Sequence, residues 1–463
     1  MPAVEAIARS HHSAIYFRGG ILVYGGTTRN NDRDAGDVRH YSINTRQWTV
    51  LSCSGNPPAA RLFSAGCAVD SPHGVAERLF IFGGLNPLRR PGPLIAASSA
   101  TSAYPAQRQE SFDKGYSSAL HVLDLRPDTP LWRVVAAEGA ANAPPPLRDS
   151  TLSWFPGRSG GTLLAFGGYD LREVHALSGR FELQSLEWKG YSVDAVAAPA
   201  ATQSQRRRSC SSDSDSAGAG CSGGSTGGGG GLAGIFGGVG LSRFRSSSSS
   251  SCCDGGAASP AGAAAGAAAG EPSGMDSASD LASIAAAAAA AAAAVRPPAP
   301  LPRRGHSGTV LNAQRLYIFG GCGGVCSYYD DLWVGTPKRD VAASGVSWSE
   351  VEATGVAPCA RAWHSATALP ARGRIIVYGG RDARGCVGDS ELLWILDVGL
   401  EGAVPPQWAC IPWPSAIVAA PRPRHAHSAT LLDELDVLVI FGGCGEDDEL
   451  LDDVSALDIS HLS

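Results

Sequence analysis

The chain has 463 residues, of which 44% are apolar and 17% charged, and its formal net charge at pH 7 is −6. This charge lacks the basic footprint of a nucleic-acid-binding surface, so we expect no nucleic acid as partner. The first residues contain no secretory signal, and no bulky apolar run is long enough for a membrane-spanning helix, so we also expect no membrane contact. Twelve cysteines without a CxxC pair favour reduced thiols, and hence a cytoplasmic or nuclear protein.

The first predicted element is a four-stranded antiparallel unit between about residues 8 and 50. Its strands follow short β-type runs that begin at Ser13, Ile21, Val38 and Trp48, with polar, Gly- and Asn/Asp-rich turns between them. One such sheet cannot bury both of its faces alone, so further copies are expected in the chain.

A three-part pattern does recur six times. Each copy opens with an arginine, followed three residues later by histidine or a small polar residue: Arg9 and His12, Arg61 and Ser64, Arg148 and Thr151, Arg303 and His306, Arg361 and His364, Arg424 and His427. The second strand ends in an aromatic residue and two glycines, beginning at Tyr24, Phe82, Phe166, Phe319, Tyr378 and Phe441. The first five copies carry a tryptophan on the last strand: Trp48, Trp132, Trp188, Trp348 and Trp408.

The copies differ in their connections. The second has a long Pro/Ala/Ser-rich connection at 85–118, and the third is the most degenerate, with its third strand expected near 174–177. Residues 192–302 contain poly-Gly, poly-Ser and poly-Ala tracts, which bury too little side-chain area to order the chain. We therefore predict one repeat domain from residues 1–191 and 303–463, with 192–302 as a low-complexity disordered insertion.

The recurring histidine, double glycine and tryptophan resemble the kelch repeat over about 350 residues. The resemblance implies an all-β fold, a propeller of six four-stranded blades around a central channel. Neither terminus offers a clear missing strand for the sixth blade. Three alternatives follow: a three-stranded sixth blade, imperfect pairing of residues 3–8 with that blade, or a seventh blade outside this sequence.

Function is expected in the loops, because glycines, repeat histidines and tryptophans have structural reasons for their places. In such a blade, the loops from the fourth strand to the next blade and from the second to the third strand lie on one face. The resemblance implies a protein-binding adaptor or scaffold that reads a partner there, and the guanidinium fork suits an acidic peptide. The predicted contacts are Arg9, Arg61, Arg148, Arg303, Arg361, Arg424, Arg381 and Arg384. The alternative is that each repeat arginine bonds to loops of the propeller itself.

The same face carries four cysteines, namely Cys322, Cys326, Cys386 and Cys444. Thiolates from adjacent loops are weak candidates for a zinc or redox site, but their spacing matches no metal motif, and unrelated free thiols are favoured. We therefore predict no metal and no cofactor.

An enzyme is the rival class. The chain contains no nucleophile elbow, phosphate loop or HExxH motif, and no Glu-x-x-x-Asp-x-x-x-His iron site of the kind found in kelch-type nitrile-specifier proteins. We predict no catalytic residues and a non-enzymatic function. The alternatives are a propeller appendage or part of a larger enzyme, and a kelch-like metal-dependent enzyme.

Overall fold

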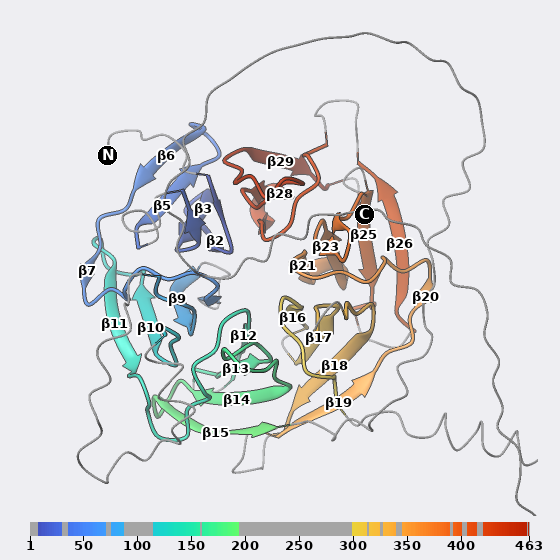
Figure 1. Cartoon of the computed structure of the whole chain (residues 1–463). Coiled ribbons are helices and arrows are strands. Elements are labelled where there is room, and N and C mark those ends of the chain that lie inside the picture. The colour runs from blue at the N-terminus through green and yellow to red at the C-terminus, as the bar shows by residue number, and fades with distance from the viewer. Residues whose placement is uncertain are drawn as a thin grey trace, which may run out of the picture. The chain divides into compact units, whose positions relative to one another are not determined.

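The computed structural model describes residues 8–29, 36–70, 76–87, 114–157, 160–193, 299–312, 314–324, 327–338, 345–388, 392–400, 405–413, 420–460 and 462. Its strands form six sheets, or blades, which follow one another in chain order around a central axis (Figure 1). The prediction of a six-bladed β-propeller is confirmed. The predicted insertion at 192–302 lies almost wholly outside the described residues.

Blades one to five each contain four antiparallel strands, with the first strand nearest the axis. Blade one consists of β2 (Ser13–Phe17), β3 (Gly20–Tyr24), β5 (Val38–Ser42) and β6 (Gln47–Val50). Blade two consists of β8 (Ala65–Asp70), β9 (Ala76–Phe82), β10 (Leu120–Asp124) and β11 (Leu131–Ala136). Blade three consists of β12 (Thr151–Phe155), β13 (Thr162–Phe166), β14 (Leu177–Glu182) and β15 (Glu187–Val193).

The remaining blades come from the second half of the chain. Blade four consists of β16 (Ser307–Leu311), β17 (Arg315–Phe319), β18 (Leu332–Pro337) and β19 (Val346–Glu350). Blade five consists of β21 (Ser365–Leu369), β22 (Arg374–Tyr378), β25 (Leu392–Asp397) and β26 (Gln407–Pro412). Blade six consists of three strands, β27 (Ser428–Leu432), β28 (Val437–Phe441) and β29 (Val454–Asp458).

Short elements complete the sheets. β7 (Ser54–Gly55) pairs in parallel with β11, and β20 (Thr354–Gly355) pairs in parallel with β26. Two short antiparallel pairs lie in the loops. β1 (Arg9–Ser10) pairs with β4 (Thr27–Thr28), and β23 (Arg381–Asp382) forms a hairpin with β24 (Gly385–Cys386). Two 3₁₀ turns, η1 (Pro370–Arg372) and η2 (Asp433–Leu435), are the only helical elements in the described part, so none of the described helices is long and apolar enough to cross a membrane.

The third strand of blade three begins later than predicted. It starts at Leu177, whereas the sequence placed it near 174–177. Val174 instead pairs with Tyr169, which closes the residues between them into a loop that folds back on itself. The predicted position of this strand was wrong because Val174, an apolar residue of the loop, is of a type that often begins a strand.

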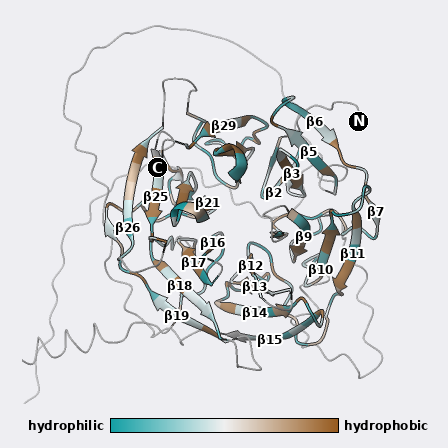
Figure 2. Cartoon of the chain, turned by 180° about the vertical axis from the view of Figure 1, so that it is seen from behind, coloured by the Kyte–Doolittle hydropathy of each residue, from teal (hydrophilic) through white to brown (hydrophobic). Residues whose placement is uncertain are grey.

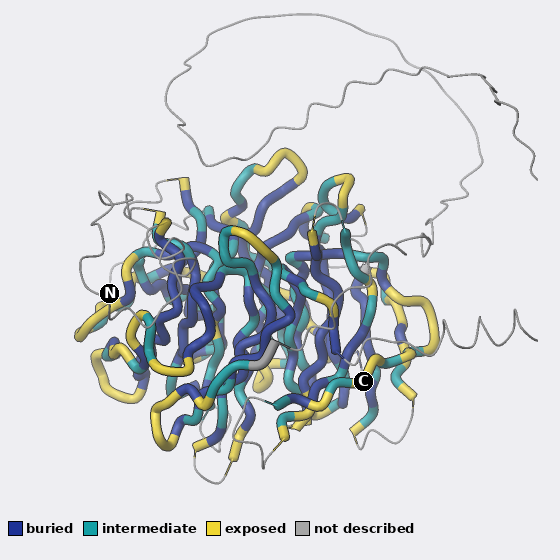
Figure 3. The backbone as a smooth tube through the Cα atoms, turned by 60° about the horizontal axis from the view of Figure 1, so that its bottom comes forward, coloured by how far each residue is buried: buried dark blue, intermediate teal, exposed yellow. Residues whose placement is uncertain are grey.

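The hydrophobic core lies between blades. Six clusters of buried apolar residues each join two consecutive blades, and hydrophobic residues concentrate in the strands (Figure 2) while exposed residues mark the turns (Figure 3). In blades one to five, the fourth-strand tryptophan packs on the aromatic residue before the glycine pair of the preceding blade. The ring pairs are Trp48 with Phe441, Trp132 with Tyr24, Trp188 with Phe82, Trp348 with Phe166, and Trp408 with Phe319.

The sixth blade has no fourth strand in the described part of the chain, yet its tryptophan position is filled. Trp413 follows the last strand of blade five, is 4% exposed, and packs with its ring 5.7 Å from that of Tyr378. It contacts the same cluster as Leu457 of blade six. A residue of blade five therefore supplies the apolar contact that the missing strand would have made.

Blades six and one close the ring directly. The N–H of Gly443 donates to the carbonyl of Arg9 at 2.8 Å, and His12 Nε2 lies 2.8 Å from the Ser428 hydroxyl. The alternative with a three-stranded sixth blade fits these contacts, since they leave no space for a seventh blade between six and one. Of the predicted partner strand at 3–8, residues 3–7 lie outside the described residues.

The double glycine allows the blades to approach each other. In blade four, Gly320 and Gly321 have φ of 62° and 91°, in the left-handed region that favours glycine. A Cβ on Gly320 would lie 2.6 Å from the carbonyl oxygen of Arg361 in the next blade. Glycine is therefore required for backbone contact between adjacent blades.

Candidate partner-binding site

Four residues lead into the first strand of every blade, and we call them the entry motif. Position 1 is Arg9, Arg61, Leu147, Arg303, Arg361 and Arg424. Position 2 is Ser10, Leu62, Arg148, Arg304, Ala362 and His425. Position 3 is His11, Phe63, Asp149, Gly305, Trp363 and Ala426, and position 4 is His12, Ser64, Ser150, His306, His364 and His427. We call the face that carries these motifs the loop face.

The register of blade three differs from the predicted one. The carbonyl of Leu147 accepts the N–H of Gly84 at 2.7 Å, just as the carbonyl of Arg303 accepts the N–H of Gly168 at 2.9 Å. Leu147 is therefore equivalent to the repeat arginines, and Arg148 lies one position later. The pairing of Arg148 with Thr151 in the repeat was wrong, because a leucine occupies position 1 in this blade.

The position 1 arginines are buried inside their blades. Their exposures are 0% for Arg9, 5% for Arg61, 0% for Arg303, 0% for Arg361 and 1% for Arg424. Each guanidinium donates to the carbonyl of the first glycine of its own glycine pair, at 2.8 to 3.1 Å. The observation fits the alternative that these arginines hold loops of the propeller together, and contact with a partner stays a prediction for these five.

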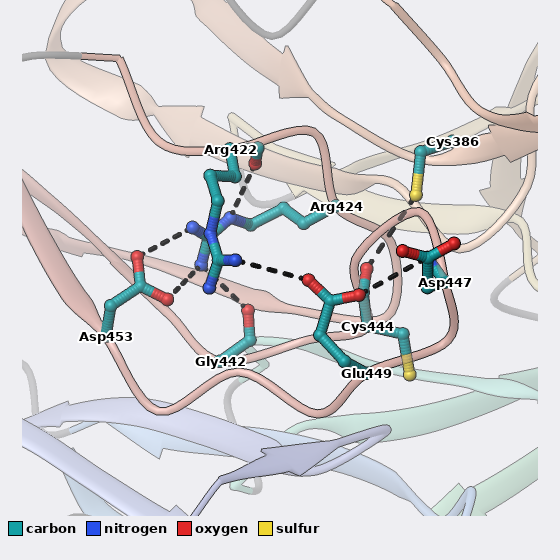
Figure 4. A network of polar contacts seen from close by, with 8 residues as sticks. All are labelled: Cys386, Arg422, Arg424, Gly442, Cys444, Asp447, Glu449 and Asp453. Carbon is teal, nitrogen blue, oxygen red and sulfur yellow. Dashed lines mark hydrogen bonds and ion pairs between the residues drawn. The ribbon is translucent and has the colours of Figure 1, made fainter. Parts of the chain in front are cut away.

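Arg424 illustrates the arrangement (Figure 4). Its guanidinium donates to Gly442 at 3.0 Å and forms a forked pair with both carboxylate oxygens of Asp453, at 3.0 and 2.6 Å. Arg303 makes the same forked pair with Asp331, at 2.7 Å for both bonds. Such bidentate bonds fix geometry, which suits a structural role.

Position 3 forms an open ring of five backbone hydrogen bonds around the axis, which runs from blade two through blade six to blade one. All six residues have positive φ, between 53° and 61°, although five of them are not glycine. This turn lets the N–H of one blade reach the position 3 carbonyl of the preceding blade. The bonds run from Asp149 to Phe63, Gly305 to Asp149, Trp363 to Gly305, Ala426 to Trp363 and His11 to Ala426, at 2.7 to 3.3 Å.

Position 4 forms a second ring, of side chains. Histidine Nε2 lies 2.8 to 3.0 Å from a hydroxyl at the start of the preceding blade's first strand. The pairs are His12 with Ser428, His306 with Thr151, His364 with Ser307, and His427 with Ser365. Burial, aided by the charge of Arg361, lowers the pKa of His364 to about 3. We therefore expect this histidine to be neutral at physiological pH.

A pocket of about 160 Å³ opens between these two rings. Its lining consists of the position 3 and 4 residues of all six blades: His11, His12, Phe63, Ser64, Asp149, Ser150, Gly305, His306, Trp363, His364, Ala426 and His427. We call it the axial pocket. Ser64 and Ser150 stand where the other blades have histidine, so the ring of imidazoles is interrupted in blades two and three.

Two solvent-accessible arginines lie beside this interruption. The Arg148 guanidinium carbon lies 5.0 Å from the ring centre of Phe63, 5.7 Å from that of Tyr116 and 5.1 Å from that of Tyr169. The Arg304 guanidinium carbon lies 5.1 Å from the ring centre of Tyr169 and 5.6 Å from that of Trp363. We call these six residues the arginine–aromatic cluster.

The cluster leaves cationic charge available. Arg148 has Asp149 beside it, with Nε 3.7 Å from Oδ2, and its side chain is 21% exposed. Arg304 has no carboxylate within ion-pair distance among the residues that the structure describes. Aromatic faces hold both guanidinium groups in place, so less entropy is lost when they bind an anion.

Arg381 and Arg384 lie on the hairpin formed by β23 and β24. The Arg381 side chain is 33% exposed and lies 3.6 Å from Asp448 of blade six. The Arg384 side chain is 79% exposed and pairs with Asp382 at 2.8 Å. Their cations therefore have carboxylate neighbours already, unlike that of Arg304.

The cysteines do not assemble into a cluster of thiolates. Burial raises the pKa of Cys386 to about 11, and it also raises the pKa of Cys322 and Cys444. The Cys386 sulfur lies 3.5 Å from His425 Nδ1 and 3.8 Å from the Cys444 carbonyl oxygen, the latter contact drawn in Figure 4. Protonated thiols are poor metal ligands, so these contacts favour free thiols. Cys326 lies outside the described residues.

One group of metal-ligand side chains exists within the described part of the chain, Asp170, Glu173 and His175 in the loop of blade three. His175 Nε2 lies 3.1 Å from Asp170 Oδ2, and the other carboxylate oxygen of Asp170 accepts the N–H groups of Arg172 and Glu173. The aspartate is thus engaged by the loop itself.

Sequence reasoning found Arg148 but missed Arg304, the three tyrosine and tryptophan faces and the axial pocket. Arg304 directly follows the repeat arginine Arg303, so the repeat spacing does not distinguish it. The replacement of histidine by serine in blade two was visible in the sequence. Its counterpart in blade three was concealed by the shifted register.

Comparison with known proteins agrees with this architecture. Residues 340–463 match the KLHDC2/KLHL20/DRC7 Kelch-repeats domain. Putative adagio-like protein 2 of Oryza sativa subsp. japonica is 33% identical over 171 residues, which are 35% of this chain and 23% of that protein. Kelch domain-containing protein 1 of Homo sapiens is 25% identical over 189 residues, which are 39% of this chain and 37% of that protein. The chain is thus similar to kelch-repeat proteins, and its described strands form a six-bladed β-propeller.

The similarity covers only part of each relative. For the flagellar outer arm dynein alpha chain of Chlamydomonas reinhardtii, 34% identity over 151 residues corresponds to 32% of this chain and 3% of that protein. The matched segments therefore span well under two thirds of these relatives.

Proposed function

We propose that the chain is a non-enzymatic adaptor or scaffold whose loop face binds an acidic segment of a partner protein. The observation that carries the proposal is the exposed part of the arginine–aromatic cluster, above all Arg304 between Tyr169 and Trp363. A guanidinium that aromatic rings hold in place without a carboxylate partner is pre-organised to bind an anion.

The geometry supports an extended acidic peptide. Aromatic rings hold Arg148 and Arg304 against the same tyrosine, Tyr169, so two carboxylates of one segment can reach both cations. Arg381 and Arg384 lie on a neighbouring blade of the same face and extend the basic surface. The buried position 1 arginines serve in this proposal as the framework that holds the loops.

The enzyme alternatives have less support. The neutral histidines of position 4 are bonded to hydroxyls of the propeller, so they are engaged in its framework. The group formed by Asp170, Glu173 and His175 is the one metal-ligand candidate within the described residues, and its aspartate bonds to its own loop. Membership of a larger enzyme as a propeller appendage is compatible with the same binding face.

The proposal is tested by selecting peptides from a random library on the purified full chain. We expect enrichment of Asp and Glu, with affinity that falls as salt rises because the contacts are ionic. The double variant Arg148→Ala/Arg304→Ala should weaken the selected peptides at least tenfold, about 1.4 kcal/mol.

A matched control is Arg126→Ala/Arg133→Ala, which removes two exposed arginines next to Asp124 in blade two. These side chains are 55% and 59% exposed and belong to the β10–β11 region. Their loss should leave peptide affinity unchanged. Equal weakening in both variants would mean that only net charge matters, and a library without acidic enrichment would refute the proposal.

A further inference from the structure

The interrupted histidine ring creates a built but unsatisfied site in the axial pocket. In four blades, position 4 fills its space with an imidazole that bonds to a hydroxyl of the preceding blade. In blades two and three the shorter Ser64 and Ser150 stand there instead. Serine does not fill the volume of an imidazole, and it does not make the hydrogen bond that the imidazole makes in the other four blades.

The two serine hydroxyls have no partner. Neither the Oγ of Ser64 nor that of Ser150 has a hydrogen bond within the described structure, and both side-chain oxygens are buried. Ser150 is 9% exposed, so more than nine tenths of it is shielded from solvent. A buried hydroxyl without a partner costs free energy, and in native proteins such groups are usually satisfied by water or a ligand.

Asp149 adds one charged acceptor to the same wall of the axial pocket. Its Oδ1 accepts the indole N–H of Trp363 at 3.1 Å, and Oδ2 lies 3.7 Å from Nε of Arg148. Each carboxylate oxygen can accept a second hydrogen bond. This wall of the pocket thus offers two hydroxyls and a carboxylate, with a guanidinium just outside.

This set of groups selects among ligand chemistries. A carboxylate entering the pocket would be repelled by Asp149. An ammonium group would be attracted by Asp149, but it has no acceptor for the protons of the two serine hydroxyls, and Arg148 lies just outside. A primary amide is neutral, donates two hydrogen bonds and accepts through its carbonyl. Hydroxyls and a carboxylate match both of these roles.

We propose that the axial pocket binds the primary amide of an asparagine or glutamine side chain that lies next to the acidic residues of the bound segment. The inference rests on the proposed function, because the same segment places its carboxylates on the arginine–aromatic cluster. It adds a specificity that arginine contacts alone do not provide.

The test uses the acidic peptides selected by the wild-type chain. Each neutral position is set in turn to Gln, Asn, Leu, Glu or Lys, and fluorescence anisotropy measures binding to the full chain. At one position, Gln or Asn should bind about tenfold more tightly than Leu, as expected for two or so satisfied hydrogen bonds. The variant Ser64→Ala/Ser150→Ala should abolish that preference and leave the affinity of the Leu peptide within about twofold.

The matched control is Ser153→Ala. Ser153 belongs to blade three, is 4% exposed and has an unpartnered Oγ, but it does not line the axial pocket. Its loss should keep the amide preference intact. Acidic peptides that bind without any amide preference, or a preference that survives in the double serine variant, would overturn this inference alone. A chain that selects no acidic peptide would overturn the proposed function as well.

Discussion

Replacing Arg303 by alanine separates the structural role of the position 1 arginines from a binding role. The side chain is 0% exposed and makes four hydrogen bonds: one to Leu301, one to Gly320 and two to Asp331, at 2.7 to 3.0 Å. Its loss leaves two carbonyls unsatisfied and a carboxylate without its cation. Breaking one side of a buried pair typically costs about 3–5 kcal/mol, so we expect a loss of that order.

The assay is urea unfolding followed by tryptophan fluorescence and circular dichroism. A loss of 3–5 kcal/mol is a large fraction of the roughly 5–15 kcal/mol that stabilises a typical domain. Arg303→Lys should recover only part of the stability, because an ammonium group cannot form the forked pair. Arg384→Ala is the control: its side chain is 79% exposed, and a surface ion pair contributes about 1 kcal/mol or less.

The structural interpretation of Arg303 would be refuted by one combination of results. An Arg303→Ala chain that unfolds within about 1 kcal/mol of wild type, but no longer binds the selected acidic peptides, would place this arginine in the binding surface. A stability loss without a change in peptide selectivity among folded molecules would support the framework role.

Three further predictions follow from the same contacts. In the folded state the pKa of His364 and of His425 is about 3, whereas histidine in the unfolded state takes up a proton below about pH 6.5. The free energy of unfolding should therefore be at its full value above pH 6.5 and fall by about 2 kcal/mol per histidine at pH 5. Urea titrations at pH 7.5 and pH 5 test this, and equal stabilities would contradict it. Trp413→Ala should cost about 3–5 kcal/mol in the same assay, because the indole replaces the missing strand's contact; a neutral change would contradict this role. Ser64→His should fill the axial pocket and find Ser13 as its hydroxyl partner, so the amide preference should disappear without loss of thermal stability; a retained preference would contradict the pocket's role.

The repeat architecture was predictable because its residues recur in order. Glycine pairs, fourth-strand tryptophans and repeat histidines make contacts between blades, and these contacts recur around the ring except where serine replaces histidine in blades two and three and where blade six has no fourth strand. Trp48 packs on Phe441 in the way that Trp408 packs on Phe319, although the first pair joins opposite ends of the chain. Because the same packing recurs between blades, the residues that make it recur in order, and one sequence is enough to show them.

The candidate site was only partly predictable, because it depends on departures from the repeat. The sequence predicts Arg148 as a repeat arginine, but its side chain is partly exposed because Leu147 holds that register instead. Arg303 pairs with an aspartate 28 residues later, and Arg9 pairs with Asp37 at the same spacing, but the sequence interpretation considered only the arginines. The axial pocket arises from side chains of all six blades, which come together only in the closed ring.

The most direct test of the proposed binding face is hydrogen–deuterium exchange of the full chain with and without its tightest acidic peptide. We expect slower exchange of the backbone amides at 147–150, 303–306 and 361–364 when the peptide is bound. These are the entry motifs of blades three, four and five, which surround the arginine–aromatic cluster. Protection confined to turns on the opposite face, such as 17–20 and 42–47, would contradict it.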